Sequence, residues 1–389
     1  MNSQFEQLLE RRGNGSMKWE RSYIKKRFGI DRDDDIYPLF IADMDYCMDE
    51  EIYQKMKDWL TQPDFGYFHI QESYYESIIQ WQKKVHHMDV NRTDIIASLG
   101  TVTSMNIACD IYAQEKGIAM LTPVYGSFAK CAGVGTCVMI PLALVAGRYE
   151  LDLQAIEQAF ITENVKVLLF CNPHNPSGRV WSRDELEAIV ELCRAYHVVL
   201  LSDEIHSDLN LGEQPFVSLL EISREEDWIM VSTSPNKTFN LSGLTTSYIL
   251  CKNQQMREAF QAYLDRLHLS CNRMGIMMSE LVYRYGYTWL QQLTKQIQSN
   301  IRIVEVAMQQ LPVQVMKPES GYLVWIYLPE IKDIDAFILA LAKQTHVLIE
   351  SGSRFVDHYD SWIRINVATS ASLLQEAMNR LVAFYQKRD

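Results

Sequence analysis

The sequence predicts an α/β fold in which a large domain, built on a mostly parallel sheet of seven strands covered by helices, precedes a smaller α+β domain. The first observation is a series of seven short apolar runs between residues 94 and 251, alternating with helical periods. These runs are hydrophobic throughout, which is typical of strands buried on both faces of a parallel sheet. The second observation is a change of pattern from about residue 287, where a long helical stretch leads into further short strands and helices.

The runs are, in order, DIIASL, GIAML, CVMIPLAL, VKVLLFC, VVLLSDE, WIMVST and SYILC. Between the fourth and the fifth run lies SRDELEAIVELCRAYH, which opens with Ser182 as an N-cap and has Glu185 three residues later. Its apolar residues recur at helical spacing, so this segment predicts a parallel strand–helix–strand unit. Ligands of such sheets bind at the carboxyl ends of the strands, so the residues directly after each run are the candidates for a site.

We expect three segments along the chain. Residues 1–45 form an N-terminal segment that joins the small domain, residues 46–286 form the large domain, and residues 287–389 form the C-terminal small domain. The stretch LQQLTKQIQSNIRIVEVAMQQL is expected to be the long helix that joins the two domains.

Composition excludes several functions. The 389 residues carry a formal net charge of -12, which argues against a nucleic-acid binder. The eight cysteines include no C-x-x-C pair and no grouping at zinc spacing, so we expect reduced thiols and no metal site. The N-terminus has no apolar signal segment, and VMIPLALVAG is too short to span a bilayer. A cytoplasmic protein that acts on small molecules, away from the membrane, is therefore expected.

Two polar side chains follow neighbouring runs. Asn175 lies in NPHNPSG, a turn that could aim its amide at a ligand oxygen or could merely connect two elements. Asp203 follows VVLL, and a carboxylate at a buried strand end needs a partner. That partner is either a salt bridge or cap within the protein, or a protonated ring nitrogen of a ligand.

Lys237 follows the sixth run in the stretch STSPNKTFN, where Ser, Thr and Asn surround it and Ser234 lies three residues earlier. A lysine is most often a surface charge. One that is desolvated at a strand end has a lowered pKa, however, and can act as a nucleophile, a Schiff-base partner and a proton carrier.

Gly100, Thr101 and Val102 lie where the first run meets a helix. The backbone N–H groups and the dipole of a helix N-terminus suit a phosphate, although a plain helix entry is the alternative. Together, the strand ends predict a ligand with a phosphate, a basic ring nitrogen, a ring oxygen and an aldehyde carbon. Pyridoxal 5′-phosphate (PLP) is that ligand.

The order of NPHNPSG, SDEIH, SPNK and IRIN along the chain resembles that of the PLP-dependent transferases of fold type I, the aminotransferase class I/II superfamily, over nearly the whole length. Within that superfamily IADMDY, FGYF, CNPHNPSGRVW, SDEIHSDL and NKTFNLSGL look most like the cystathionine β-lyase branch, the MalY/PatB-type C–S lyases. One position departs from the pattern. The residue before the lysine is usually a small hydroxyl, and here it is Asn236.

The resemblance implies a role for each matching residue. Lys237 would bind the cofactor covalently, Asp203 would pair with the pyridine nitrogen, and Asn175 would bind the ring oxygen with His206 close by. Tyr125 would stack on the ring, and the phosphate would be held by Thr101, Val102 and Ser234.

Two further residues extend the implied site. Arg364 in IRIN would bind the α-carboxylate of the substrate through its planar fork, although a rim ion pair is the alternative. Tyr67 in FGYF would reach the phosphate of the neighbouring subunit, which implies a homodimer with shared active sites.

The resemblance implies a C–S β-lyase that converts cystathionine or a related amino acid to pyruvate, ammonia and a thiol. Lys237 would act as the general base, and Tyr125 or the lysine would protonate the departing sulfur. An aminotransferase of small or aromatic amino acids would use the same residues and remains the alternative. A PLP-binding regulatory protein is a third reading, for which the sign would be a broken site.

Overall fold

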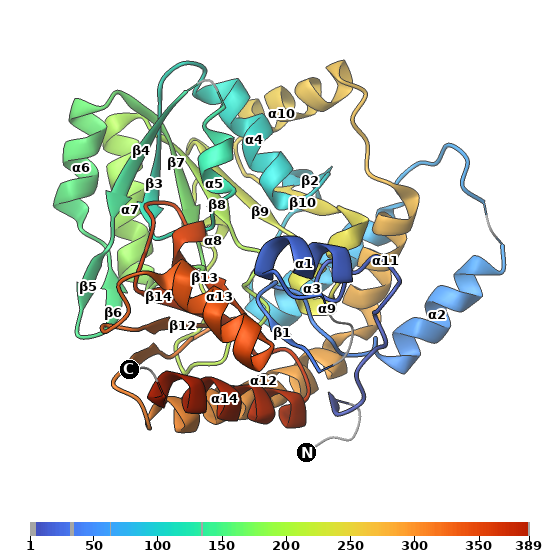
Figure 1. Ribbon diagram of the computed structural model, residues 1–389. Helices are drawn as coiled ribbons and strands as arrows, with labels where there is room; N and C mark the ends of the chain where they lie inside the picture. The colour runs from blue at the N-terminus through green and yellow to red at the C-terminus, as the bar shows by residue number, and fades with distance from the viewer. Residues whose placement is uncertain (1–4, 32–34, 63, 134, 388–389) are drawn as a thin grey trace.

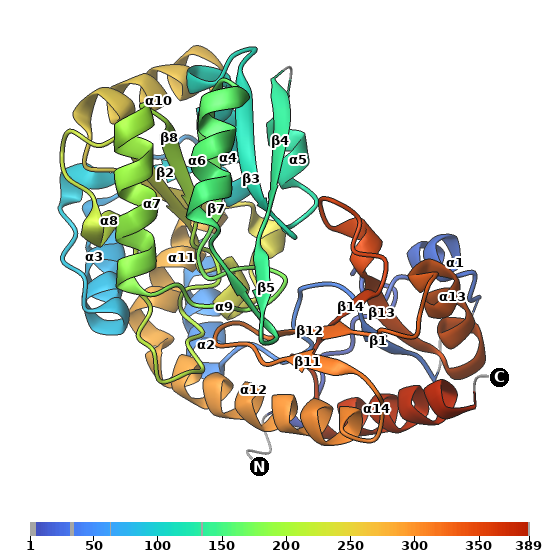
Figure 2. The ribbon, with the colours of Figure 1, turned by 90° about the vertical axis from the view of Figure 1, so that its left-hand side faces the viewer.

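The computed structural model describes residues 5–31, 35–62, 64–133 and 135–387. These residues contain a sheet of seven strands, a sheet of five strands and a two-stranded hairpin, β5 (Ala143–Val145) with β6 (Arg148–Glu150). Figures 1 and 2 show the two larger sheets in different parts of the molecule. In Figure 2 the long helix α12 (Tyr287–Met308) runs beneath both of them.

The large sheet has the strand order β2-β10-β9-β8-β7-β3-β4. Only β10 runs antiparallel to its neighbours, and the other strands are parallel. Each of the seven apolar runs overlaps one strand of this sheet, so the predicted mostly parallel seven-stranded sheet is confirmed. The strands are β2 (Ile95–Ser98), β3 (Gly117–Thr122), β4 (Thr136–Pro141), β7 (Val165–Cys171), β8 (Val199–Asp203), β9 (Ile229–Thr233) and β10 (Ser247–Leu250).

Both faces of the large sheet are covered along its central strands, as their unbroken hydrophobicity predicts, but the edge strand β4 alternates buried and exposed residues, and its Met139 is exposed. Along β7, Leu168 and Phe170 belong to one buried cluster, whereas Val167 and Leu169 belong to another on the opposite face. The helices beside the strands are α4 (Thr101–Tyr112), α5 (Phe128–Cys131), α6 (Leu153–Thr162), α7 (Arg183–Tyr196), α8 (Leu219–Ile222) and α10 (Gln254–Arg266).

Helix α7 begins where the sequence predicts it. The Ser182 side chain accepts a hydrogen bond from the backbone N–H of Glu185, and the Glu185 carboxylate accepts one from the backbone N–H of Ser182. This capping box satisfies donors that the first turn of a helix leaves without partners.

The small sheet has the strand order β1-β13-β14-β12-β11. Strand β1 (Tyr37–Leu39) runs parallel to β13 (Val347–Ser351), so a segment near the N-terminus is part of a sheet whose other strands are C-terminal. The other pairs are antiparallel, through β14 (Trp362–Asn366), β12 (Leu323–Tyr327) and β11 (Gln314–Met316). The segment boundaries at residues 45 and 286 stay a prediction.

The remaining helices are α1 (Arg21–Phe28), α2 (Glu50–Leu60), α3 (Glu72–His86), α9 (Asn236–Phe239), α11 (Arg273–Tyr285), α13 (Ile334–Thr345) and α14 (Ala371–Gln386). In the part of the chain that the structure describes, none of the helices has the length and apolar character needed to cross a bilayer.

Candidate active site

A cavity of about 640 Å³ lies where the carboxyl ends of the large-sheet strands face the small sheet. It brings together most of the residues that the sequence singles out, from segments far apart in the chain. The predicted residues that line it are Gly100, Thr101, Val102, Tyr125, Asn175, Asp203, His206, Lys237 and Arg364.

Lys237 lies in the short helix α9, four residues after β9 ends. Its Nζ donates a hydrogen bond of 2.9 Å to the backbone carbonyl oxygen of Ala42. Burial and, to a smaller extent, the nearby Arg364 guanidinium lower the pKa of this amine to about 8, although Asp43 and Asp203 oppose the shift. A lysine with this pKa is partly neutral near physiological pH, as a nucleophile or base must be.

Asp203 is the last residue of β8 and is buried. Its carboxylate accepts a hydrogen bond of 3.2 Å from the backbone N–H of Ile205. Burial raises its pKa to about 6, although the Ile205 N–H and the Lys237 charge oppose this. Neither a salt bridge nor a helix cap within the described chain accounts for this carboxylate, so a cationic group of a ligand would stabilise it.

His206 is also buried, and burial lowers its pKa to about 3, with a further contribution from Lys237 and Arg364. The imidazole is therefore neutral at ordinary pH, so it can accept or donate a hydrogen bond without adding a charge to the cavity.

Arg364 lies on β14 and is buried at the side of the cavity that the small sheet forms. Its Nη1 donates to Asn175 Oδ1 at 3.2 Å, and its Nη2 donates to the carbonyl oxygen of Phe40 at 3.4 Å. Its Nε has no hydrogen-bond partner among the described residues. Because a buried donor without a partner is costly, an arginine in this state is suited to bind a carboxylate through its fork.

The opposite end of the cavity is formed by the start of α4. Gly100, with φ of 108°, is the N-cap residue. The first turn of α4 therefore has no side-chain cap. A Cβ at Gly100 would have nothing within 4 Å, so the space in front of the helix is open. Thr101, Val102 and Thr103 line the cavity here, which makes this end suitable for an anion.

Two predicted residues do not line the cavity. Ser234 is buried, and its Oγ accepts a hydrogen bond of 3.2 Å from the backbone N–H of Asn236. Tyr67 is fully exposed and lies beside a separate surface hollow that includes Phe65 and Phe68. The roles of both residues stay predictions.

Other residues reach the cavity without a clear signal in the sequence. Asn236 lines it, but the side-chain Nδ2 already donates to the carbonyl oxygen of Thr246 at 3.0 Å. Ser242 and Thr245 line it as well, and only the polar composition of the segment after the lysine hints at them. Ala42 contributes a backbone carbonyl, which no pattern of side chains could reveal.

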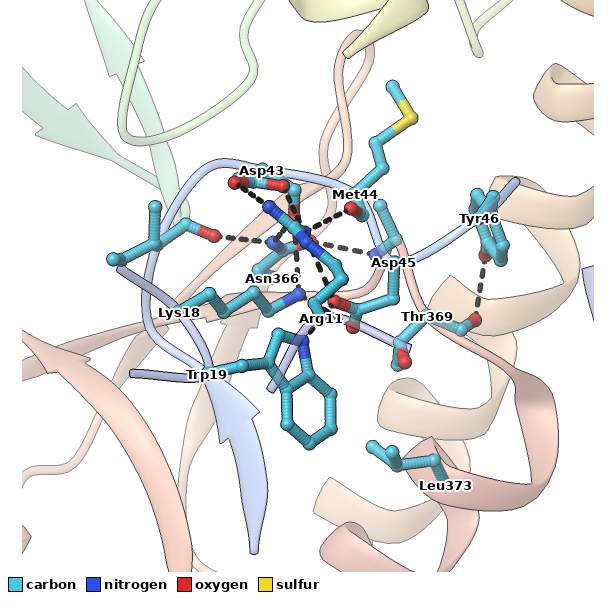
Figure 3. A network of polar contacts seen from close by, with 12 residues as sticks. Arg11, Lys18, Trp19, Asp43, Met44, Asp45, Tyr46, Asn366, Thr369 and Leu373 are labelled. Carbon is cyan, nitrogen blue, oxygen red and sulfur yellow. Dashed lines mark hydrogen bonds and ion pairs between the residues drawn. The ribbon is translucent and has the colours of Figure 1, made fainter. Parts of the chain in front are cut away.

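The loop that carries Ala42 is held by buried charged groups (Figure 3). Asp45 accepts hydrogen bonds from Lys18 Nζ at 2.7 Å and from Trp19 Nε1 at 2.8 Å, and the Lys18 and Asp45 side chains are fully buried. Both carboxylate oxygens of Asp43 bind Arg11, each at 2.6 Å. The two acidic residues of the IADMDY motif therefore have a structural role, because their contacts fix the backbone next to Ala42.

The same loop is also bound to the small sheet. Asn366, the last residue of β14, donates from Nδ2 to the carbonyl oxygens of Ile41 and Asp43, the latter at 2.7 Å. Since Arg364 lies two residues earlier on the same strand, one strand positions both the arginine and the loop that contacts Lys237.

Residues 42–381 match the family model described as aminotransferase class I and II. The chain belongs to this family. It is 31% identical to the cystathionine beta-lyase PatB of Bacillus subtilis, over 97% of this chain and 99% of that protein. It is also 27% identical to the protein MalY of Escherichia coli, over 97% of each chain.

Among solved structures, this member of the aminotransferase class I and II family is similar to cystalysin from Treponema denticola, which contains pyridoxal 5′-phosphate. The TM-score is 0.93 and the identity 29%, over 98% of each chain. A PLP-bound putative aminotransferase from Clostridium difficile gives a TM-score of 0.92 and an identity of 29%, over 98% of this chain and 99% of that one.

The cavity of this family member fits the predicted cofactor. The buried Asp203 carboxylate, with its raised pKa, suits a protonated ring nitrogen. The open helix start at Gly100 suits a phosphate. Lys237, with its lowered pKa, lines the same cavity and suits a covalent bond to an aldehyde carbon. The residues of the cavity therefore match the cofactor at its ring nitrogen, its phosphate and its aldehyde carbon.

Proposed function

We propose that this protein is a PLP-dependent carbon–sulfur β-lyase that acts on cystathionine and related S-substituted cysteines by α,β-elimination. The observation that carries the proposal is the placement of Lys237, Asp203 and Arg364 in one cavity. The full-length similarity to PatB supports the lyase class. In the overall reaction, the substrate and one water molecule yield a thiol, pyruvate and ammonium. The C–S bond breaks, and the sulfur gains a proton.

The residues of the cavity divide the chemical work. When bound, pyridoxal phosphate supplies a ring that accepts the electron pair left on the substrate Cα after proton removal. Lys237 Nζ would hold the cofactor covalently at rest and, once released, would remove the proton from the substrate Cα. Asp203 would hold a proton on the ring nitrogen, and Asn175 would donate a hydrogen bond to the ring oxygen.

Arg364 orients the substrate by binding its α-carboxylate, and its unpaired Nε is the donor that such a carboxylate would satisfy. Tyr125 is 42% exposed and lines the cavity, so its ring is available to stack on the cofactor. Its hydroxyl, or the Lys237 ammonium after it has taken the Cα proton, supplies the proton to the departing sulfur.

The proposal includes a homodimer with shared active sites. Tyr67 is fully exposed and lies outside the cavity of its own chain. An exposed tyrosine on a segment that also exposes Phe65 is suited to insertion into a second subunit. In this arrangement its hydroxyl donates to the phosphate in the partner's site.

An aminotransferase is the second candidate, because the matching family model bears that description. One experiment separates the two activities: the purified protein is incubated with cystathionine, with and without an added keto acid, and pyruvate and free thiol are followed. Thiol and pyruvate without a keto acid are expected of the lyase. Conversion of the amino acid only with a keto acid would contradict the lyase, and neither reaction despite bound cofactor would indicate a binding protein.

A further inference from the structure

A second group of charged residues lines the cavity on the side of the small sheet. Arg27 from α1, Glu350 from β13 and Arg354, which follows β13, all face the cavity that contains Lys237 and Arg364. We call these three residues the outer cluster. Glu350 is the register partner of Arg364 on the adjacent strand, so the outer cluster begins directly beside the arginine proposed to bind the α-carboxylate.

The outer cluster carries one excess positive charge. Glu350 Oε1 forms ion pairs with Arg27 Nη2 and with Arg354 Nε, the latter at 3.5 Å. One carboxylate therefore faces two guanidinium groups. Arg364 adds a further positive charge, which the α-carboxylate of a substrate would neutralise. The excess positive charge of the outer cluster would still lack an anionic partner.

The three side chains differ in freedom. The exposed fraction is 15% for the Arg27 side chain and 10% for Glu350, and the Arg27 guanidinium also lies over the Phe40 ring at 4.8 Å. The Arg27 and Glu350 side chains are therefore held in place by their surroundings. The Arg354 side chain is 59% exposed, so it can turn toward a ligand at little cost.

We propose that the outer cluster is a subsite for a carboxylate at the far end of the substrate, on the sulfur side of the bond that breaks. This inference rests on the proposed lyase function and specifies its substrate class. Preferred substrates carry a second carboxylate beyond the sulfur, and Arg354 binds it. Where the far end also carries an ammonium group, Glu350 is the available acceptor, so a zwitterionic end is tolerated as well.

A matched series of substrates tests this subsite. S-(2-carboxyethyl)-L-cysteine, S-(2-aminoethyl)-L-cysteine and S-propyl-L-cysteine share the reacting atoms and differ in charge at the far end. With the holoenzyme, we expect kcat/KM for the carboxyethyl compound to exceed that for the propyl compound by about fivefold, the range of a partly exposed ion pair. The aminoethyl compound should be the poorest of the three.

Variants assign the preference to the outer cluster. Arg354→Ala should reduce the carboxyethyl-to-propyl ratio to about one, and Arg354→Glu should invert it in favour of the aminoethyl compound. The matched control is Arg21→Ala, since Arg21 lies on α1 like Arg27 and is 51% exposed, but does not line the cavity. This control should keep the wild-type ratio.

A binding measurement separates this inference from the proposed function. In the cofactor-loaded Lys237→Ala variant, which lacks the proposed base, calorimetric Kd values for the carboxyethyl and propyl compounds should differ in the same direction, and Arg354→Ala should remove the difference. If no compound yields a thiol, the lyase function fails while the Kd ratio still decides the subsite. Equal Kd values, or a preference that Arg354→Ala leaves intact, would overturn the inference.

Discussion

The Nζ of Lys237 donates a 2.9 Å hydrogen bond to the carbonyl oxygen of Ala42, a residue 195 positions earlier in the chain. The hydroxyl of Tyr322 donates to the same carbonyl at 3.2 Å. Through this contact, the loop between β1 and α2 holds the amine in the cavity. The loop is held in turn by Asn366 and by the buried Lys18 and Asp45 pair.

Lys237→Ala should abolish covalent attachment of the cofactor, because no amine would remain at the end of β9. Borohydride reduction followed by mass spectrometry of the protein measures this attachment. Lys130→Ala is the matched control, since Lys130 also lines the cavity but is exposed on α5, and it should retain the attachment. A reduced adduct in Lys237→Ala would overturn the assignment of the lysine.

Asp203→Asn should stabilise the cofactor-free protein above about pH 6. The folded-state pKa of about 6 lies above the ordinary 3.8, so the folded protein binds the proton more tightly and loses stability as the pH rises through this range. The variant lacks this loss, which could reach about 3 kcal/mol. Thermal unfolding of both proteins between about pH 4 and pH 7 measures the difference.

Asp227→Asn is the control for this pH dependence. Burial tends to raise the pKa of Asp227, but the hydrogen bonds and charges of Arg194 and Arg224 together outweigh burial and lower the pKa. Its stabilising contribution is therefore present above the ordinary pKa and is lost as the pH falls, so this variant should be less stable than wild type near neutrality. If Asp203→Asn behaved like Asp227→Asn, the Asp203 carboxylate would have a partner within the protein.

Arg364→Lys should raise KM for amino acids by about tenfold or more, because an ammonium group keeps the charge but cannot provide two parallel hydrogen bonds. The cofactor should stay bound, as its absorbance would show, since Lys237, Asp203 and the start of α4 are unchanged. Steady-state kinetics with a range of substrate concentrations provides the measurement. An unchanged KM would assign Arg364 to a structural role with Asn175.

Lys18→Met should destabilise the protein by about 3 kcal/mol, because it removes the nearer cation of the fully buried Asp45 carboxylate and leaves only Arg11, whose Nη1 lies 3.5 Å from it. Asp45→Asn in the same chain should recover part of this loss. Arg21→Met breaks an exposed ion pair with Asp31 and should cost only about 0–1 kcal/mol. Urea unfolding of the three variants measures these costs, and equal costs for Lys18→Met and Arg21→Met would contradict the prediction.

Tyr67→Ala and Lys237→Ala subunits should complement each other if each site uses a tyrosine from its partner. Each variant alone should be inactive or nearly so. After the two are unfolded together and refolded, random pairing gives one intact site in half of the dimers, hence about a quarter of wild-type activity. No recovery in a mixture that forms dimers would place Tyr67 outside the partner's site.

The sequence by itself determined the large sheet and the residues at its strand ends. Seven apolar runs specify buried strands, and Ser182 with Glu185 specifies the start of α7, because each signal depends on neighbours a few residues apart. In a parallel sheet the strand ends meet at one edge, so Asp203, Asn175 and Lys237 could be assigned to one place before any coordinates were known.

Only the tertiary structure decided which groups surround the lysine. The contact of Lys237 with the carbonyl of Ala42 and the pairing of Arg27 with Glu350 across 323 residues depend on how distant segments pack. Local sequence patterns do not predict such contacts. Any residue type can provide a backbone carbonyl, and the side-chain directions in a short helix such as α9 depend on the elements packed around it. The lowered pKa of Lys237 is a product of that packing, since burial is its largest cause.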